Sequence, residues 1–454
     1  MRSEWVERTI GEIAEVVGGG TPSTKDPSNF DGDIPWLTPK DLSRNHPRYV
    51  SRGARNLTRK GLETSSARLL PANSVLLTSR APIGYVAIAA NPIATNQGFR
   101  SLILKEEYDH EFVYYWLKAH KAELERHASG STFKELSGSA LKQIRIRLPL
   151  VKSEQRAIAH ILGMLDDKIE LNRRMNETLE AMARALFKSW FVDFDPVVVN
   201  AIKAGNPIPN KFAKRAAHYR QNPDALHLPE HFICLFPDRF VDSELGPIPE
   251  GWEVKTFRNM CLQPQYGYTA SANERPVGPK FLRIKDINKT PWINWHEVPY
   301  CSISQRQKQK YLLRSGDLVI ARIADPGHSA LIEEQVEAVF ASYLIRFRPA
   351  DEVYDRYLQY WLRSDPYWQL VKRRQSGSTR GNLNARVLGA FPLVVPDPQV
   401  ESQFRKTVEK IREQVVANVK EANTLASVRD TLLPKLISGE LRVPDVERIV
   451  GDHL

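Results

Sequence analysis

Residues 158–186, IAHILGMLDDKIELNRRMNETLEAMARAL, carry the pattern that decides the fold. The residues that would form one face of a helix here recur at alternating steps of four and three: Ile161, Leu165, Lys168, Asn172, Met175, Leu179, Met182 and Leu186. A period of 3.5 residues kept over about four heptads is typical of a coiled coil rather than of a surface helix. We therefore expect a long helix within 151–195, with Ser153 as its N-cap.

A second heptad run, FRKTVEKIREQVVANVKEANTLASVRDTL, fills residues 404–432. Its seam passes through Phe404, Val408, Ile411, Val415, Asn418, Ala422, Leu425, Val428 and Leu432. We expect a second helix in the segment 398–436 that stops at Pro434, because proline cannot continue a helix without losing a hydrogen bond. Each seam of about 28 residues would span about 42 Å at 1.5 Å per residue.

The two helices are the ends of a larger repeat with a period of about 246 residues. The matching features are Trp5 and Trp252, YYWL at 114–117 and QYWL at 359–362, SGST at 129–132 and 376–379, and NETLEAM at 176–182 against ANTLASV at 422–428. A period this long lies outside the range of solenoid repeats. It indicates duplication of a whole domain together with its helix.

Each seam holds one asparagine near its centre, Asn172 in the first and Asn418 in the second. Two tandem copies can imitate a two-fold dimer, and antiparallel helices would then place these two residues opposite each other on the axis. A single core asparagine costs stability but fixes register and pairing mode. The alternative is that both side chains point to solvent.

The remaining chain predicts an α+β fold with two similar globular parts, 1–150 and 251–397. Both contain short β-like runs between Gly/Pro/Asn-rich turns, and each contains an amphipathic helix, at about 109–127 and 353–373. Trp116 and Trp361 on these helices are expected in the cores. Residues 196–250 form a connector of low regularity, and 437–454 form a C-terminal tail.

Composition narrows the possible partners. The chain has 64 Lys+Arg against 53 Asp+Glu, a formal net charge of +11, which favours a polyanion as partner. Three cysteines without CxxC spacing argue against disulfides and structural zinc. No apolar run approaches 18 residues and the first residues do not resemble a signal peptide, so a cytoplasmic protein is expected.

Motifs that would carry catalysis are weak in this chain. His227 and His231 match an HxxEH zinc pattern, but Pro229 between them disfavours the helix that this chemistry needs. Asp193 and Asp195 could bind a cation, although a turn at a helix end accounts for them more simply. The glycines at 18–20 lack nucleotide-binding spacing, and there is no Gly-Lys pair for a phosphate-binding loop. We expect no catalytic residues and no metal site.

Duplicated α+β units that each precede a long helix resemble the specificity (S) subunit of type I restriction–modification enzymes. The segments that carry the resemblance are LKQIRIRLPLVKSEQRAIAHIL, LNRRMNETLEAMARALFKSWFVDFDPV, VDSELGPIPEGWEVKTF and ANTLASVRDTLLPKLISGEL, and IPEGWEV and SWFVDFDP are its most characteristic parts. The resemblance covers essentially the whole chain. One departure is Glu421, which stands where the first helix has Met175, so the two helices need not dock partners equally.

The resemblance implies two target recognition domains, 1–150 and 251–397, separated by an antiparallel two-helix coiled coil. Each would read one block of a bipartite double-stranded DNA target, and the helices would dock two modification (methyltransferase) subunits and the restriction (motor-nuclease) subunits. S-adenosylmethionine, ATP and Mg²⁺ would belong to those partners and not to this chain. The seam length of about 42 Å compares with about one DNA turn, 34–36 Å.

Candidate DNA-contacting residues follow from the repeat. Lys40 matches Lys285 in a polar loop after a strand, where each would contact phosphate or remain a solvated surface lysine. Arg80 and Arg322 end apolar strands, where DNA contact and a structural ion pair are equally plausible. Ser131, Thr132, Ser378 and Thr379 of the SGST repeat could hold a phosphate or, more simply, cap a short helix. The neighbouring residues Lys134, Arg380 and Asn382 differ between the copies and are candidates for base readout.

Two other functions remain open at this point. A self-contained DNA methyltransferase or nuclease would need the cofactor and cleavage motifs that the sequence lacks. A coiled-coil scaffold without a DNA role would account for the helices but not for two duplicated globular units in a basic chain.

Overall fold

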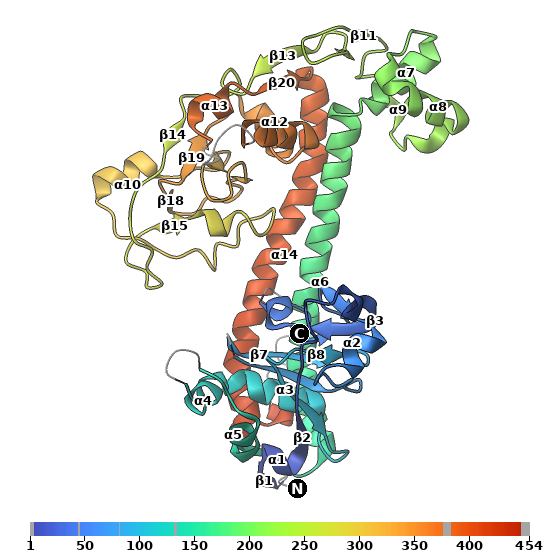
Figure 1. Cartoon of the computed structure of the whole chain (residues 1–454). Helices are drawn as coiled ribbons and strands as arrows, with labels where there is room; N and C mark the ends of the chain where they lie inside the picture. Colours follow the sequence, from blue (N-terminus) through green and yellow to red (C-terminus); the bar gives the residue numbers. More distant parts are fainter. Residues whose placement is uncertain (1–3, 44–45, 81, 131–133, 376–382, 446–454) are drawn as a thin grey trace. The chain divides into compact units, whose positions relative to one another are not determined.

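Two long helices, α6 (Lys152–Phe191) and α14 (Pro398–Ser438), organise the chain (Figure 1). The computed structural model describes residues 4–43, 46–80, 82–130, 134–375 and 383–445. The chain divides by its internal packing into unit 1, which comprises Met1–Asn172 and Glu421–Leu454, and unit 2, Arg173–Lys420. Each long helix therefore contributes one part to each unit.

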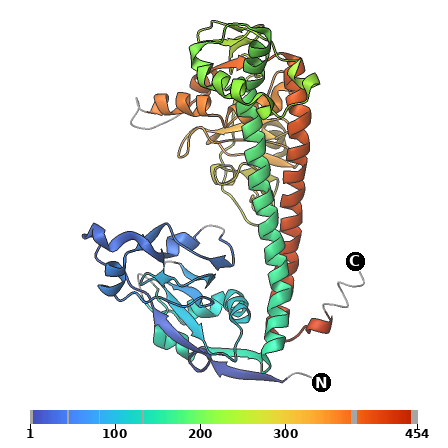
Figure 2. The same cartoon turned by 90° about the vertical axis from the view of Figure 1, so that its right-hand side faces the viewer.

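The helices pair antiparallel in both units, as the sequence predicts, and they lie side by side in both views of the chain (Figures 1 and 2). The direction follows from the contacts between them, in which the α14 number falls as the α6 number rises: Asp166 with Arg429 and Lys168 with Glu421 in unit 1, Asn176 with Asn418 and Glu180 with Arg412 in unit 2.

The asparagines have partners other than those expected. Asn172 donates its amide Nδ2 to the Glu421 carboxylate over 2.8 Å, and Asn418 donates to Asn176 Oδ1 over 2.8 Å. Asn176 in turn donates to the main-chain oxygen of Val415. The expected Asn172–Asn418 pair is therefore replaced by an Asn176–Asn418 pair, about one helical turn away. A register inferred from the midpoints of two seams carries that much error, because contacts near the helix ends set the register. Both expected asparagines are nevertheless buried, so the solvent-facing alternative is wrong.

Pro434 does not end the second helix, which continues to Ser438. The three apolar residues Leu433, Leu436 and Ile437 are buried in the core of unit 1. Their burial stabilises the helical path beyond the proline, although proline lacks the N–H that would bond back to the preceding turn. The first helix begins two residues earlier than an N-cap at Ser153 implies, at Lys152, and Ser153 lies inside it.

Unit 1 is an α+β domain with three sheets. The largest has the order β2 (Ala14–Gly18), β9 (Arg100–Leu104), β6 (Val75–Ser79), β7 (Ile83–Ala89), β4 (Tyr49–Val50). The second has the order β5 (Arg55–Leu57), β3 (Phe30–Leu37), β8 (Ala94–Thr95), with β3 and β8 parallel. In the third, β1 (Trp5–Thr9) pairs antiparallel with β10 (Arg145–Pro149).

Unit 2 repeats the central part of this plan, without counterparts of β4 and β5 among its described strands. Its largest sheet has the order β14 (Gln265–Tyr266), β19 (Leu344–Phe347), β16 (Leu318–Ala321), β17 (Ser329–Leu331). A parallel pair joins β15 (Lys280–Leu282) to β18 (Ala338–Phe340), and an antiparallel pair joins β13 (Glu253–Thr256) to β20 (Pro392–Val395). These match β2-β9-β6-β7, β3-β8 and β1-β10 of unit 1. The duplicated α+β fold expected from the repeat is confirmed.

The amphipathic helices are each broken into two. The first is α3 (His110–Ala119) followed by α4 (Lys121–Arg126), and the second is α11 (Asp355–Trp361) followed by α12 (Asp365–Gln375). Trp116 and Trp361 are buried, as predicted. The short helices of the units are α1 (Ile10–Ile13), α2 (Arg59–Glu63), α5 (Gly138–Gln143), α10 (Gln305–Tyr311) and α13 (Ala385–Gly389).

The connector is more regular than the sequence predicts. It contains α7 (Asp195–Ala204), α8 (Ala213–Gln221) and α9 (Glu230–Ile233), followed by a small hairpin of β11 (Phe240–Val241) and β12 (Ile248–Pro249). Its apolar residues Val197, Phe212 and Phe236 belong to the same core cluster as the C-terminal end of α6. The abundance of Pro, Asn and Gly suggested a loop, but burial of this apolar set gives the segment its helical structure.

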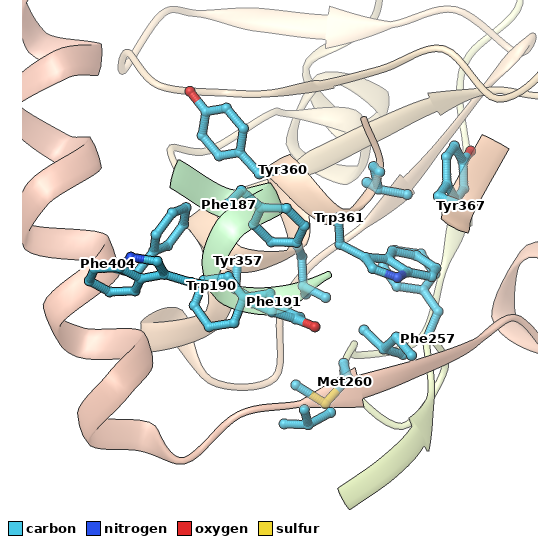
Figure 3. Packing of buried hydrophobic residues seen from close by; sticks show 14 of the residues in the cluster. Phe187, Trp190, Phe191, Phe257, Met260, Tyr357, Tyr360, Trp361, Tyr367 and Phe404 are labelled. Atoms are coloured by element: carbon cyan, nitrogen blue, oxygen red, sulfur yellow. The ribbon is translucent and has the colours of Figure 1, made fainter. Parts of the chain in front are cut away.

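The end of α6 shows why the SWFVDFDP stretch is so aromatic. Phe187, Trp190 and Phe191 point into a cluster with Tyr357 from α11 and Phe404 from α14 (Figure 3). The Phe191 and Phe404 rings meet edge to face at 5.0 Å, and Phe191 and Tyr357 do so at 5.1 Å. Aromatic pairs of this geometry add to the free energy gained by burial. The stretch therefore fastens both long helices to the globular part of unit 2.

Candidate nucleic-acid interface

Lys40 and Lys285 occupy equivalent one-turn helices in the two units. Lys40 lies in the 3₁₀ turn Pro39–Leu42 directly after β3, and Lys285 lies in the 3₁₀ turn Ile284–Asp286 after β15. In each turn the aspartate next to the lysine bonds back to the N-cap residue, Asp41 to Thr38 and Asp286 to Arg283. Both lysines are exposed. The aspartate thus fixes the turn, and the lysine beside it faces solvent. The polar loop predicted from the sequence is therefore a hydrogen-bonded turn.

A tight strand-end loop lies beside each lysine turn. In unit 1 the backbone of Gly19 passes so close to the carbonyl oxygens of Thr95 and Asn96 that a Cβ atom there would collide with them. Gly267 stands in the same relation to Phe340 and Ala341 in unit 2. Gly19 and Gly20 thus serve close backbone approaches, Gly19 to Thr95 and Asn96 and Gly20 to Ser66 and Ala67.

The lysine turn of unit 1 continues into a strip of loops. A Cβ on Gly98 would lie 2.7 Å from Pro39 Cγ, the Gly98 oxygen accepts from the Ser79 N–H, and the Ser79 oxygen accepts from the N–H of Leu136. We call this strip, with Lys40, Gly98, Ser79, Arg80 and Lys134, the rim of unit 1. Lys134 is exposed at its far end.

Arg80 has an acidic partner in this rim. Its guanidinium lies 3.6 Å from the Glu135 carboxylate, which also binds Arg100 at 3.0 Å. The Arg80 side chain is 37% exposed. The ion pair expected as one role for Arg80 is present, and its contact with DNA stays a prediction.

The rim of unit 2 follows the same path with different side chains. The Ala341 N–H donates to the Leu282 oxygen, the Arg322 N–H donates to the Tyr343 oxygen, and the Leu383 N–H donates to the Arg322 oxygen. We call the strip with Lys285, Tyr343, Arg322 and Leu383 the rim of unit 2. These bonds pair Arg322 with Ser79 of unit 1, because Ser79 makes the same two contacts. Arg80 and Arg322, which both end apolar strands, are therefore not at equivalent positions but one residue apart.

Arg322 stacks on an aromatic ring and has no acidic partner among the described residues. Its guanidinium carbon lies 5.3 Å from the centre of the Tyr266 ring. The Tyr266 hydroxyl accepts a hydrogen bond from the Ala385 N–H over 3.1 Å. The arginine is partly buried, whereas Tyr266 and Tyr343 are 41% and 52% exposed. Neither tyrosine was predicted from the repeat. The equivalent positions in unit 1 hold glycines, and comparing the two copies identifies only residues that are the same in both.

Six of the predicted residues lie outside the described part of the chain: Ser131, Thr132, Ser378, Thr379, Arg380 and Asn382. Their proposed contact with phosphate or bases stays a prediction.

The residues of the two weak cation motifs make contacts within the protein. Asp193 and Asp195 both bind Arg215, at 2.5 Å for Asp195 Oδ1, and Asp195 also accepts from the Ser189 hydroxyl. Pro229 is the N-cap of α9, so only His231 of the two histidines is helical. Over the described ranges, no group of three or more His, Cys, Asp and Glu side chains is placed to hold a metal ion.

In the described residues, no helix has both the length and the apolar character needed to cross a membrane.

Comparisons with known proteins assign the family. A model described as type I restriction modification DNA specificity domain matches residues 2–181. Over 466 aligned positions the chain is 33% identical to the type I restriction enzyme MjaIX specificity subunit of Methanocaldococcus jannaschii, and the match covers 98% of this chain and 95% of that protein. The chain belongs to the type I restriction enzyme specificity subunits. The resemblance inferred from its sequence motifs is confirmed.

Two further members show how widely the specificity-subunit family varies. The HindI specificity subunit of Haemophilus influenzae is 27% identical over 339 positions, 68% of this chain and 72% of that protein. The crystal structure of the type I restriction–modification S subunit from M. genitalium shares the fold, with a TM-score of 0.55 at 16% identity and 96% of each chain covered. The specificity-subunit fold is therefore kept while most residues change.

Proposed function

We propose that this specificity subunit recognises a double-stranded DNA target of two short blocks, and that the rim of each unit reads one block. The observation that carries the proposal is the exposed lysine turn repeated in both units, next to strips that otherwise differ in sequence. Phosphate contacts fix register on the duplex, whereas base contacts supply sequence choice. The lysine shared by both rims fits the phosphate contact, and the neighbouring residues that differ between the rims fit the base contacts.

The long helices have two roles in this proposal. They space the two units, and they dock two modification subunits and the restriction subunits of the complex. Exposed apolar residues on the helices suit docking: Met164 and Leu171 on α6 and Val428 on α14 in unit 1, and Met182 on α6 in unit 2.

Glu421 gives the two helices different surfaces. It binds Lys168 at 3.4 Å and accepts from Asn172 at 2.8 Å, whereas Met175 stands at the corresponding place on α6. Part of this difference therefore serves helix pairing in unit 1. In our proposal S-adenosylmethionine, ATP and Mg²⁺ bind the partner subunits.

The test is a map of N6-methyladenine in a host that carries the modification subunit, with and without this chain. We expect a two-block motif that disappears when the chain is removed. The purified complex should bind the same motif, with log affinity that falls linearly with log salt, at about −0.9 for each phosphate neutralised. An unchanged methylome in the presence of an active modification subunit would overturn the proposal.

A further inference from the structure

Three equivalent positions distinguish the rims of the two units. Gly18 pairs with Arg100 in the β2–β9 ladder and Tyr266 pairs with Ile345 in the β14–β19 ladder, at corresponding places. By their main-chain hydrogen bonds, Ser79 corresponds to Arg322 and Gly98 to Tyr343. Small residues in unit 1 are thus replaced in unit 2 by an arginine and two tyrosines.

The fold does not require these large side chains. Unit 1 builds the same strand order with glycine or serine at all three positions. Tyr266 and Tyr343 also leave about half of their surface in solvent, so a large part of each side chain does not contribute to the core. Large, exposed aromatic residues beside an arginine are instead typical of binding surfaces.

Arg322 is held in a defined orientation. Its backbone is fixed by hydrogen bonds on both sides, to the oxygen of Tyr343 and from the N–H of Leu383. The planar guanidinium lies over the Tyr266 ring, and the Tyr266 hydroxyl is itself fixed by the N–H of Ala385. The planar fork of a guanidinium is itself pre-organised, so less freedom is lost for each hydrogen bond that it forms.

The geometry points to a base contact, and we propose that Arg322 reads the guanine of one G·C pair in the block bound by unit 2. A guanidinium donates two parallel hydrogen bonds to guanine O6 and N7 in the major groove, which is the commonest specific contact of arginine with DNA. Tyr266 is the positioning residue that aims the guanidinium. Unit 1, with Ser79 and Gly18 at these positions, lacks this contact, so the two blocks follow different rules. The inference rests on the proposed function of the rims.

The first variant is Arg322→Lys, which keeps the positive charge and removes the fork of donors. In the complete complex we expect about tenfold to hundredfold weaker binding of the target. In the methylome, one G·C position of one block should become tolerant of other bases, while the other block stays unchanged. Thermal unfolding of the complex should match the unmodified protein, because unit 1 folds without this arginine.

Two variants of Tyr266 separate positioning from folding. Tyr266→Phe keeps the ring under the guanidinium, and we expect it to preserve the guanine preference. Tyr266→Leu removes the ring and should relax the same G·C position as Arg322→Lys. Should Arg322→Lys fail to fold, this pair still tests the inference, because both changes fall on a side chain that is 41% exposed.

A matched control is Lys285→Ala in the same rim. It should weaken binding to the target and to unrelated duplexes equally and leave the methylated motif intact. An unchanged motif with both Arg322→Lys and Tyr266→Leu, or an equal loss at both blocks, would overturn the inference while the two-block function remains. Absence of any two-block motif for the unmodified chain would instead overturn the proposed function.

Discussion

Both units fasten a helix pair to a globular part in the same way, but with different exposure to water. In unit 1 the Tyr115 hydroxyl donates to the Asp166 carboxylate on α6 over 2.8 Å, and Arg429 on α14 binds the same carboxylate at 2.5 Å. In unit 2 Tyr360 donates to Glu180 on α6 over 3.2 Å, and Arg412 on α14 binds Glu180 at 2.8 Å. The two tyrosines come from the equivalent helices α3 and α11.

The cluster of unit 2 is closed and that of unit 1 is open. Glu333, from the loop after β17, binds Arg412 at 2.5 Å and Arg356 at 2.6 Å and covers the site. The Arg412 side chain is 0% exposed, against 18% for Arg429. Burial raises the pKa of Glu333, but the charges of Arg412 and Arg356 outweigh it and bring the pKa to about 2. Unit 2 therefore depends on each member of its cluster more strongly than unit 1 does.

The largest expected effect comes from removing the central arginine of each cluster. Arg412→Met leaves Glu180 and Glu333 buried with part of their positive partners gone, and we expect unit 2 to lose about 3–5 kcal/mol of stability. Arg429→Met should cost less, since Asp166 keeps Lys118 and the Tyr115 hydroxyl as partners and the pair is less completely buried. Urea unfolding, followed together with hydrogen exchange of the helix amides, measures both. Equal losses would show that the difference in burial has no energetic consequence.

A second difference concerns one helix position near the start of each long helix. Gln155 on α6 is buried and satisfied, because it accepts from the Asp109 N–H over 2.8 Å and donates to the Pro149 oxygen over 2.9 Å. Gln155 lies three residues after the first residue of α6. The equivalent position of α14 holds Glu401, which is also buried. Burial and the neighbouring carboxylate of Asp355 raise the pKa of Glu401 to about 8, against the opposing charge of Arg405.

We expect this glutamate to make the stability of unit 2 fall as the pH rises from about 4.5 to about 8. Its pKa is higher in the folded than in the unfolded chain, where it is 4.5. Its contribution is therefore fully present below pH 4.5 and is lost as pH rises through about 8. Glu401→Gln, which copies unit 1, should remove that slope and stabilise the protein above pH 8 by about 1–3 kcal/mol. Urea unfolding from pH 5 to 9 is the measurement, and a slope unchanged by the substitution would contradict the expectation.

The asparagines give a smaller contrast. Asn418→Ala leaves the buried side-chain oxygen of Asn176 without its donor and should cost about 1–3 kcal/mol. Asn172→Ala should cost less, because its partner Glu421 keeps Lys168 and is 46% exposed. Replacing both Asn176 and Asn418 by Leu should restore much of the loss. Denaturant midpoints of the three variants test this order, and a greater loss for Asn172→Ala would reverse it.

Sequence patterns predicted local and repeated features well. The 3.5-residue period identified both helices, and the repeat placed Lys40 and Lys285 at positions that prove equivalent. The patterns failed where the outcome depends on packing between distant residues. Burial of Leu436 and Ile437 carries α14 past Pro434, and apolar contacts of Phe212 make the connector helical.

The candidate site was predictable only in its shared part. Tyr266 and Tyr343 could not be found by matching copies, because glycines stand opposite them. The equivalence of Arg322 and Ser79 depends on strand register. A one-residue difference in register cannot be seen when two dissimilar sequences are matched only at a few widely separated motifs.

The smallest expected effect tests whether the two units contact DNA alike. Lys40→Ala and Lys285→Ala should each reduce the slope of log affinity against log salt by about 0.9, because each removes one phosphate contact. Lys203→Ala, an exposed lysine of the connector, serves as the control and should leave the slope unchanged. Equal reductions would mean that the shared turn sets the register of both units on the duplex. A reduction from one lysine alone would mean that the units approach the backbone differently, in spite of their common turn. If neither variant changes the slope, the lysine turns are solvated surface and the phosphate contacts lie elsewhere in the rims.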